Sequence, residues 1–143
     1  MVKMFAVLRR KPGLTHEEFV DHWRDHHGPL IRDTPALARH IVRYEQHARH
    51  RPDGLSGNED IDGVAVQWFE SIDEFAGFIA EPAYPELVAP DEQRFIDMSR
   101  IEFLITEEPN VVIDGPRTPA EGGPAGVDST GGSGDRGGAG GGA

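Results

Sequence analysis

The sequence predicts an α+β fold whose four strands and two helical regions follow one another in the order β-α-β-β-α-β. Two observations support this order. Short apolar runs bounded by turn residues indicate the strands, and capping motifs followed by amphipathic stretches indicate the helices. The order is that of a ferredoxin-like protomer, in which the helices cover one face of a four-stranded sheet.

Turn and capping residues mark the first strand and the start of the first helix. We predict the strand over residues 3–10, an apolar run that ends at Lys11-Pro12-Gly13. Thr15 then opens a helix, because Glu18 stands three residues later, where it completes a capping box.

The first helix has one apolar face that includes histidine. At about 100° per residue, Phe19 and Trp23 fall on that face, with His26 near its centre and His27 at its border. Pro29 has no N–H to donate and disfavours helix at the residue before it. We therefore expect the helix to end or kink at this proline.

The rest of the domain supplies three strands and a second helical region. Strands are predicted over residues 37–49, 61–70 and 100–106. Ser71, with a glutamate three residues on, opens a helix over 72–80, and a further helical stretch over 91–99 follows three prolines.

The strands over 3–10 and 61–70 are apolar on both faces, whereas the helices can cover only one face of the sheet. The other face must therefore meet something else, and a second copy of the sheet is the simplest cover. We predict a homodimer in which two protomers form a dimeric α/β barrel around a shared interior.

The chain of 143 residues is expected to hold one domain. Residues 115–143 contain 12 of the 18 glycines, and such a composition cannot offset its own chain entropy. The folded domain is predicted over residues 1–108, followed by a Gly/Pro-rich disordered tail over 109–143.

Charge and composition exclude several classes of function. The net charge of −11 argues against general binding to nucleic acid or membrane surfaces. The absence of cysteine excludes disulfides, thiolate metal sites and a cysteine nucleophile. No signal-like segment or run of about 20 apolar residues is present, so we expect a cytoplasmic protein.

All seven histidines lie in residues 1–51, the half of the domain with excess positive charge. That charge either is ordinary surface charge or lines a site for a neutral or anionic small molecule. His27 is the first candidate catalytic residue, since a histidine at a helix end beside an apolar cavity can act as general acid or base. The alternative is that it only caps free carbonyls. His26 is a second candidate, although its position equally fits packing in the core.

Further candidates come from the second and third strands. Tyr44 and His40 are four residues apart, so on one strand they would share a face, which looks either into the dimer interior or toward the helices. Tyr44 is a candidate catalytic residue and His40 a candidate for binding substrate. Trp23 and Trp68 would form an aromatic wall for an apolar ligand, or else belong to the core.

His22 completes the set of candidate substrate-binding residues. Its i, i+4 spacing from His26 is also that of two metal ligands on a helix, but the residue after His22 is Trp23 and not the glutamate of the HExxH motif. We therefore predict no metal.

Motifs along residues 2–108 resemble those of the EthD family of small dimeric α/β-barrel proteins. The matching segments are Lys11-Pro12-Gly13, Thr15, Phe19, His22–Leu30, Trp68-Phe69, Phe75, Asp91–Phe95, Phe103 and Glu107-Glu108. The resemblance implies that His27 is the family histidine, Trp23 the family aromatic residue and Tyr44 a match in the second strand. A histidine at His26 departs from the family pattern.

The family is associated with oxidative degradation of ethers and with natural-product pathways, and related barrels often work without a cofactor. The resemblance thus implies a cofactor-independent, oxygenase-like oxidoreductase acting on an apolar, oxygen-bearing small molecule. The alternatives are an isomerase, cyclase or decarboxylase on the same scaffold, or a non-catalytic dimeric binding or accessory protein. The expected partners are the substrate and a second copy of the chain.

Overall fold

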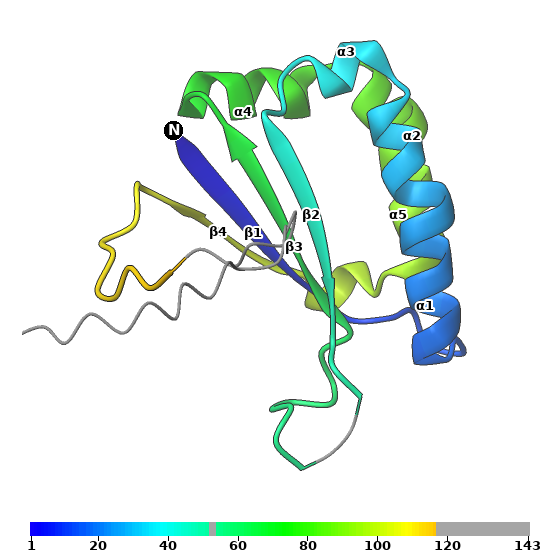
Figure 1. Ribbon diagram of the computed structural model, residues 1–143. Helices are drawn as coiled ribbons and strands as arrows, with labels where there is room; N and C mark the ends of the chain where they lie inside the picture. The colour runs from blue at the N-terminus through cyan, green and yellow to red at the C-terminus, as the bar shows by residue number, and fades with distance from the viewer. Residues whose placement is uncertain (52–53, 117–143) are drawn as a thin grey trace, which may run out of the picture. The chain divides into compact units, whose positions relative to one another are not determined.

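Four strands form one antiparallel sheet in the order β2-β3-β1-β4 (Figure 1). The strands are β1 (Val2–Leu8), β2 (Arg43–Ala48), β3 (Gly63–Phe69) and β4 (Glu102–Thr106). The computed structural model describes residues 1–51 and 54–116, and its first compact unit is Met1–Asn110. The predicted ferredoxin-like fold is confirmed.

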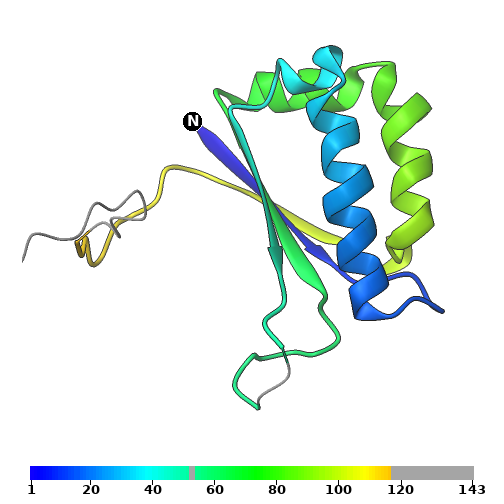
Figure 2. The ribbon, with the colours of Figure 1, turned by 45° about the vertical axis from the view of Figure 1, so that its right-hand side comes forward.

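The helices lie on one face of this sheet (Figure 2). The first group consists of α1 (His16–His22), the π-helical turn η1 (Trp23–His27), α2 (Gly28–Arg32) and α3 (Pro35–Ala38). The second consists of α4 (Ile72–Ala80), the π-helical turn η2 (Tyr84–Val88), α5 (Ala89–Phe95) and the short 3₁₀ helix η3 (Met98–Arg100). None of the helices in the described residues is long and apolar enough to cross a membrane.

The first helix begins as predicted but does not end at Pro29. The capping box is present, since the Glu18 amide donates to Thr15 Oγ1 at 3.1 Å and the Thr15 amide donates to Glu18 Oε1 at 3.0 Å. At η1 the Gly28 amide donates to the carbonyl of Trp23, five residues back, and the chain stays helical to Arg32. A wider π turn accommodates the proline, whose N–H is missing and whose ring needs room.

The π turn changes which side chains are buried. Because it holds one extra residue, it sets the following residues back by about 100° around the helix axis. His27 and Ile31 thereby enter the buried face, and His26 turns outward. His27 is 6% exposed, whereas His26 is an exposed residue, so of the two alternatives given for His26, packing in the core is wrong.

The segment before β2 also differs from the prediction. Pro35, at the first position of α3, starts a helical turn, and β2 begins only at Arg43. His40 therefore lies before the strand, and the predicted strand face shared by His40 and Tyr44 does not exist.

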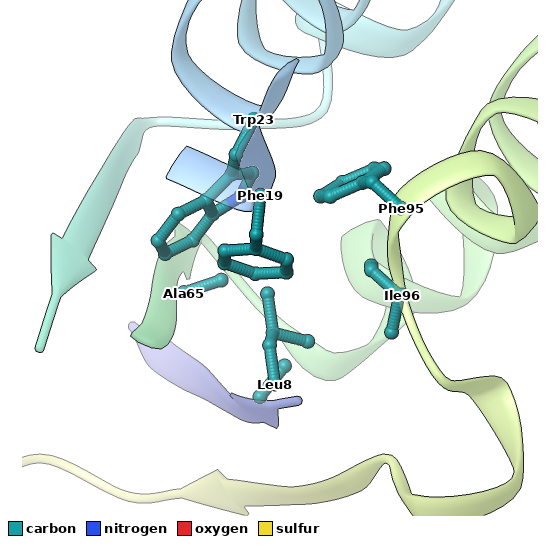
Figure 3. Packing of buried hydrophobic residues seen from close by; sticks show 7 residues of the cluster. Leu8, Phe19, Trp23, Ala65, Phe95 and Ile96 are labelled. Carbon is teal, nitrogen blue, oxygen red and sulfur yellow. The ribbon is translucent and has the colours of Figure 1, made fainter. Parts of the chain in front are cut away.

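Aromatic packing fixes the first helix over the sheet (Figure 3). The ring of Phe19 lies 5.4 Å from that of Trp23 and 5.3 Å from that of Phe95, which belongs to α5. Trp23 packs directly on Gly63 of β3, where an added Cβ would lie 2.5 Å from the indole. This close approach sets the height of the helix, and so the position of His27 one turn later.

No helix of the described chain covers the second face of the sheet (Figure 2). Phe5, Val66 and Leu104 lie opposite one another across the three strands β1, β3 and β4 on this face. Trp68 is on the same face, with the Lys3 ammonium 5.2 Å from its ring centroid. Hereafter this is called the bare face.

Residues 111–116 form no helix or strand, and Val111, Val112 and Ile113 are exposed. Most of the tail predicted over 109–143 lies outside the described residues.

Candidate active site

A cavity of about 330 Å³ lies between the sheet and the helices. Its wall is mostly apolar, with contributions from all of the strands and both helical groups. Five polar side chains interrupt that wall: His27, Tyr44, Gln67, Tyr84 and Glu92. An apolar cavity with a few polar groups is the usual form of a small-molecule site.

His27 and Asp91 form a buried pair at this cavity. His27 Nδ1 lies 2.8 Å from Asp91 Oδ2, and the imidazole ring packs 5.0 Å from the ring of Phe95. A carboxylate at Nδ1 selects the tautomer in which Nδ1 carries the proton, which leaves Nε2 as the basic nitrogen. Burial lowers the pKa of His27, although the hydrogen bond to Asp91 opposes that shift, so the imidazole is neutral and able to accept a proton.

Asp91 binds a second histidine on its other oxygen. His22 Nε2 lies 2.9 Å from Asp91 Oδ1. Burial raises the pKa of Asp91, but the hydrogen bonds to His27 and His22 outweigh it and bring the pKa below its usual value. Asp91 therefore stays ionised between the two imidazoles.

Glu92 and Tyr84 form a second polar pair in the cavity wall. The Tyr84 hydroxyl donates to Glu92 Oε1 at 3.0 Å. Burial raises the pKa of Glu92; the hydrogen bond from Tyr84 opposes this shift, and the negative charge of Asp91 adds to it. Burial, followed by the charge of Glu92, also raises the pKa of Tyr84. The cavity thus holds a carboxyl group that takes up a proton more readily than an ordinary glutamate.

Tyr44 presents a hydroxyl to the same space. Its oxygen accepts hydrogen bonds from Trp23 Nε1 and Gln46 Nε2, each at 3.3 Å, so its own proton is available to a ligand. Burial raises the pKa of Tyr44, which keeps it a neutral donor. In the middle of β3, the buried Gln67 Oε1 has no hydrogen-bond partner in the described structure.

The structure brings together only some of the residues predicted for the site. His27, Tyr44 and Trp23 line the cavity, and His22 lies outside it but is linked to His27 through Asp91. Three others do not line it.

Those three have other surroundings. His26 faces an outer groove, and Trp68 lies on the bare face. His40 Nδ1 and Nε2 pair with Glu74 at 2.7 Å and Glu81 at 2.8 Å, so His40 connects the segment before β2 with the region of α4. In the described part of the chain, no group of three or more potential ligands could hold a metal ion.

Sequence reasoning did not identify Asp91, Glu92, Tyr84 or Gln67 as site residues. Acidic residues in the first turn of a helix have a local explanation, because the helix dipole favours them there. The sequence signal that points to Asp91 and Glu92 is that residues Asp91–Phe95 match a family motif. Tyr84 is next to prolines that favoured a break in the helix.

Fold and cavity together define a small ferredoxin-like protein with an apolar cavity lined by a few ionisable side chains. The model of the EthD domain matches residues 11–99, and the chain belongs to the EthD family.

Two relatives carry the name of an activity. The chain is 29% identical over 106 residues to the "Conidial pigment biosynthesis dehydratase EthD" of Metarhizium robertsii, a match that covers 67% of this chain and 74% of that protein. It is 28% identical over 132 residues to "Dehydratase aurZ" of Gibberella zeae, with 85% and 86% covered. Both relatives are thus named as dehydratases.

Solved structures support the fold. A dimeric protein of unknown function with a ferredoxin-like fold from Bacteroides fragilis superposes with a TM-score of 0.56 at 14% identity. The match covers 75% of this chain and 95% of that one.

Proposed function

We propose that the protein is a dehydratase that eliminates water from an apolar β-hydroxy carbonyl compound. The observation that carries the proposal is the pairing of a neutral, carboxylate-oriented imidazole with a glutamate of raised pKa in one apolar cavity. Elimination of water needs such a base and such an acid. The names of the two relatives support the same reaction.

In the proposed reaction, His27 Nε2 removes the proton from the carbon next to the carbonyl. The electron pair of that C–H bond becomes the new C=C bond, while the C–O bond to the leaving hydroxyl breaks. Glu92 gives its proton to the hydroxyl, which leaves as water. His27 then loses one proton and Glu92 regains one, so the enzyme returns to its first state.

Tyr44 has the properties of a donor to the carbonyl oxygen, where negative charge develops as the proton is removed. Its hydroxyl proton is available and its pKa is raised, so it donates without ionising. The Tyr84 hydroxyl binds Oε1 of Glu92, which leaves Oε2 to carry the acidic proton.

The oxidoreductase activity expected from the family resemblance remains a prediction. Neither relative's name mentions oxidation, whereas the polar groups of the cavity are those used in proton transfer. Isomerisation would use the same base without loss of the hydroxyl, and product analysis separates the two reactions.

The test is to incubate the protein with a panel of apolar β-hydroxy ketones. Product formation is monitored by the ultraviolet absorbance of the conjugated ketone and by mass spectrometry. We expect loss of one water per turnover, and a fall in kcat of about 100-fold or more in His27→Gln and Glu92→Gln. His16→Gln is the control, because His16 pairs with Asp62 and does not line the cavity. Products that retain the oxygen, or normal turnover in His27→Gln, would contradict the proposal.

We also propose that a second copy of the chain covers the bare face. Apolar side chains on this face support it, among them Leu104, which is 62% exposed. Sedimentation should show a dimer for the unaltered protein and a monomer for Leu104→Asp. Leu87→Asp is the matched control, since Leu87 is 43% exposed in η2, on the helical side, and should leave the dimer intact. A monomeric unaltered protein would refute the homodimer.

A further inference from the structure

Asp91 connects two histidines that have different access to solvent. His27 holds Oδ2 from the cavity side, with 7% of its side chain exposed, and His22 holds Oδ1 with 24% exposed. The mechanism proposed above uses His27 and Asp91 and assigns no role to His22. Asp91 nevertheless links the buried His27 to His22, whose imidazole is accessible to water.

The π turn of η1 is what places both histidines on one carboxylate. His22 and His27 are five residues apart, so a regular α-helix would separate them by about 140° around its axis. The extra residue of the π turn reduces this separation to about 40°, and both rings then face α5. The ring of Phe95, at 4.7 Å from His22 and 5.0 Å from His27, packs against both.

His22 faces charged groups from three elements. In the outer groove it lies with Glu18 and Asp21 of α1, with Asp25 and His26 of η1, and with Arg94 of α5. The ring centroid of His26 is 5.2 Å from that of His22, and Arg94 lies 3.5 Å from Asp91 Oδ1. Of the three linked residues His22, Asp91 and His27, His22 is therefore the one that contacts the charged groups of the outer groove.

We propose that His22 is a positioning residue of the active site: it holds Asp91 from the outer side of the helices, and its charge controls how readily His27 takes up a proton. The proposal rests on the proposed function in that His27 is taken as the base. His22 does not line the cavity; it contacts Asp91, and it acts on His27 through this carboxylate and through its own charge.

The physical reason is competition for one negative charge. A protonated His22 neutralises part of the charge of Asp91 and adds its own positive charge, and both effects disfavour a proton on His27. The charge of His22 is accordingly one of the causes that lower the pKa of His27, after burial. With a neutral residue at position 22, more of the negative charge of Asp91 acts on His27. His27 should then hold its proton to a higher pH.

The test follows the protonation of His27 directly, by nuclear magnetic resonance of labelled imidazoles in the full chain without substrate. His22→Gln keeps an N–H for Asp91 but removes the charge, and we expect the pKa of His27 to rise by about 0.5 unit or more. His16→Gln is the matched control, because His16 also pairs with a buried aspartate, Asp62 at 2.8 Å, but has no contact with Asp91. It should leave the pKa of His27 unchanged.

A second measurement uses the unaltered protein, so that the test holds even where a variant fails to fold. In the unaltered protein the ring resonances of His27 should also move at the pH where those of His22 move, because both imidazoles share one carboxylate. An unchanged pKa of His27 in His22→Gln and His22→Asn, an equal shift in His16→Gln, or His27 resonances in the unaltered protein that do not respond at the pH where those of His22 move would overturn the proposal.

The same variants separate this inference from the proposed function. If the protein eliminates water, the acid limb of its kcat/KM profile should move to higher pH in His22→Gln and stay in place in His16→Gln. A shifted His27 titration without any elimination activity would refute the proposed reaction and leave the coupling standing. Elimination with an unmoved profile and an unmoved titration would refute the coupling alone.

Discussion

Replacement of Asp91 by asparagine tests the orientation of His27 with little change in shape. Asp91 is 4% exposed and accepts from His27 Nδ1 at 2.8 Å and from His22 Nε2 at 2.9 Å. An asparagine has one oxygen and one NH₂ group in place of the two carboxylate oxygens. One of the two imidazole N–H groups would therefore face the NH₂ group, and two donors would meet. His27 escapes that clash by moving its proton from Nδ1 to Nε2, which places hydrogen on the nitrogen needed as base.

The expected result is a loss of about 10²–10⁴-fold in kcat, the range typical for a misoriented acid–base histidine. The free energy of unfolding should fall by about 1.5–3 kcal/mol, since one hydrogen bond to a charged group is lost. The assays are the elimination rate, urea unfolding, and the nitrogen resonances of His27. Normal turnover, with the proton still on Nδ1, would refute the assigned role of Asp91.

The pH dependence of the same variant has a defined sign. The pKa of Asp91 is lowered in the folded protein, so its contribution to stability is present above the unfolded value of about 3.9 and lost as the pH falls through the folded value. The stabilities of Asp91→Asn and the unaltered protein should therefore converge in acid.

Three further predictions concern stability. Gly63→Ala should lower the free energy of unfolding by about 1–3 kcal/mol in urea, because its Cβ would lie 2.5 Å from Trp23 and 2.8 Å from a backbone oxygen; an unchanged midpoint would contradict the packing. Hydrogen bonds to Glu81 and then Glu74 raise the pKa of His40, so its stabilisation is complete below about pH 6.5 and disappears as the pH rises through the folded value. The difference in Tm between the unaltered protein and His40→Gln should accordingly shrink toward pH 9, and a growing difference would reverse the assignment. Deletion of residues 115–143 should leave Tm unchanged by calorimetry, as their glycine-rich composition predicts, and a drop of several degrees would oppose it.

Sequence reasoning succeeded where the signal is local. The capping box at Thr15 and the apolar strands depend on neighbouring residues, and both were predicted. The π turn depends on a hydrogen bond from Gly28 to Trp23 that a regular period of 3.6 residues does not anticipate. One extra residue in one turn was enough to exchange the expected surroundings of His26 and His27.

Only some of the residues that line the candidate site were predicted from the sequence. His27 and Tyr44 line the cavity, and the family motif together with their places on the helix and the strand had made them candidates; their roles remain predictions. Asp91 was not a candidate, because its partner His27 is 64 residues away and a carboxylate at the start of a helix needs no partner to explain it. Glu92 escaped for the same reason. The acid–base character of the cavity arises from contacts between two helices that lie side by side (Figure 2).

Both helical groups that line the cavity contain a π turn followed at once by X-Pro: η1 before Gly28-Pro29 and η2 before Ala89-Pro90. A protein engineer who idealised the first helix at its full length, with substitutions that favour regular i to i−4 hydrogen bonds, would remove the wider turn. That change would turn the residues after it by about 100°, so the outward histidine position and the cavity position would change places. Selection for a stiffer helix and selection for a working cavity therefore oppose each other at this turn, and stabilising designs for this fold should leave it untouched.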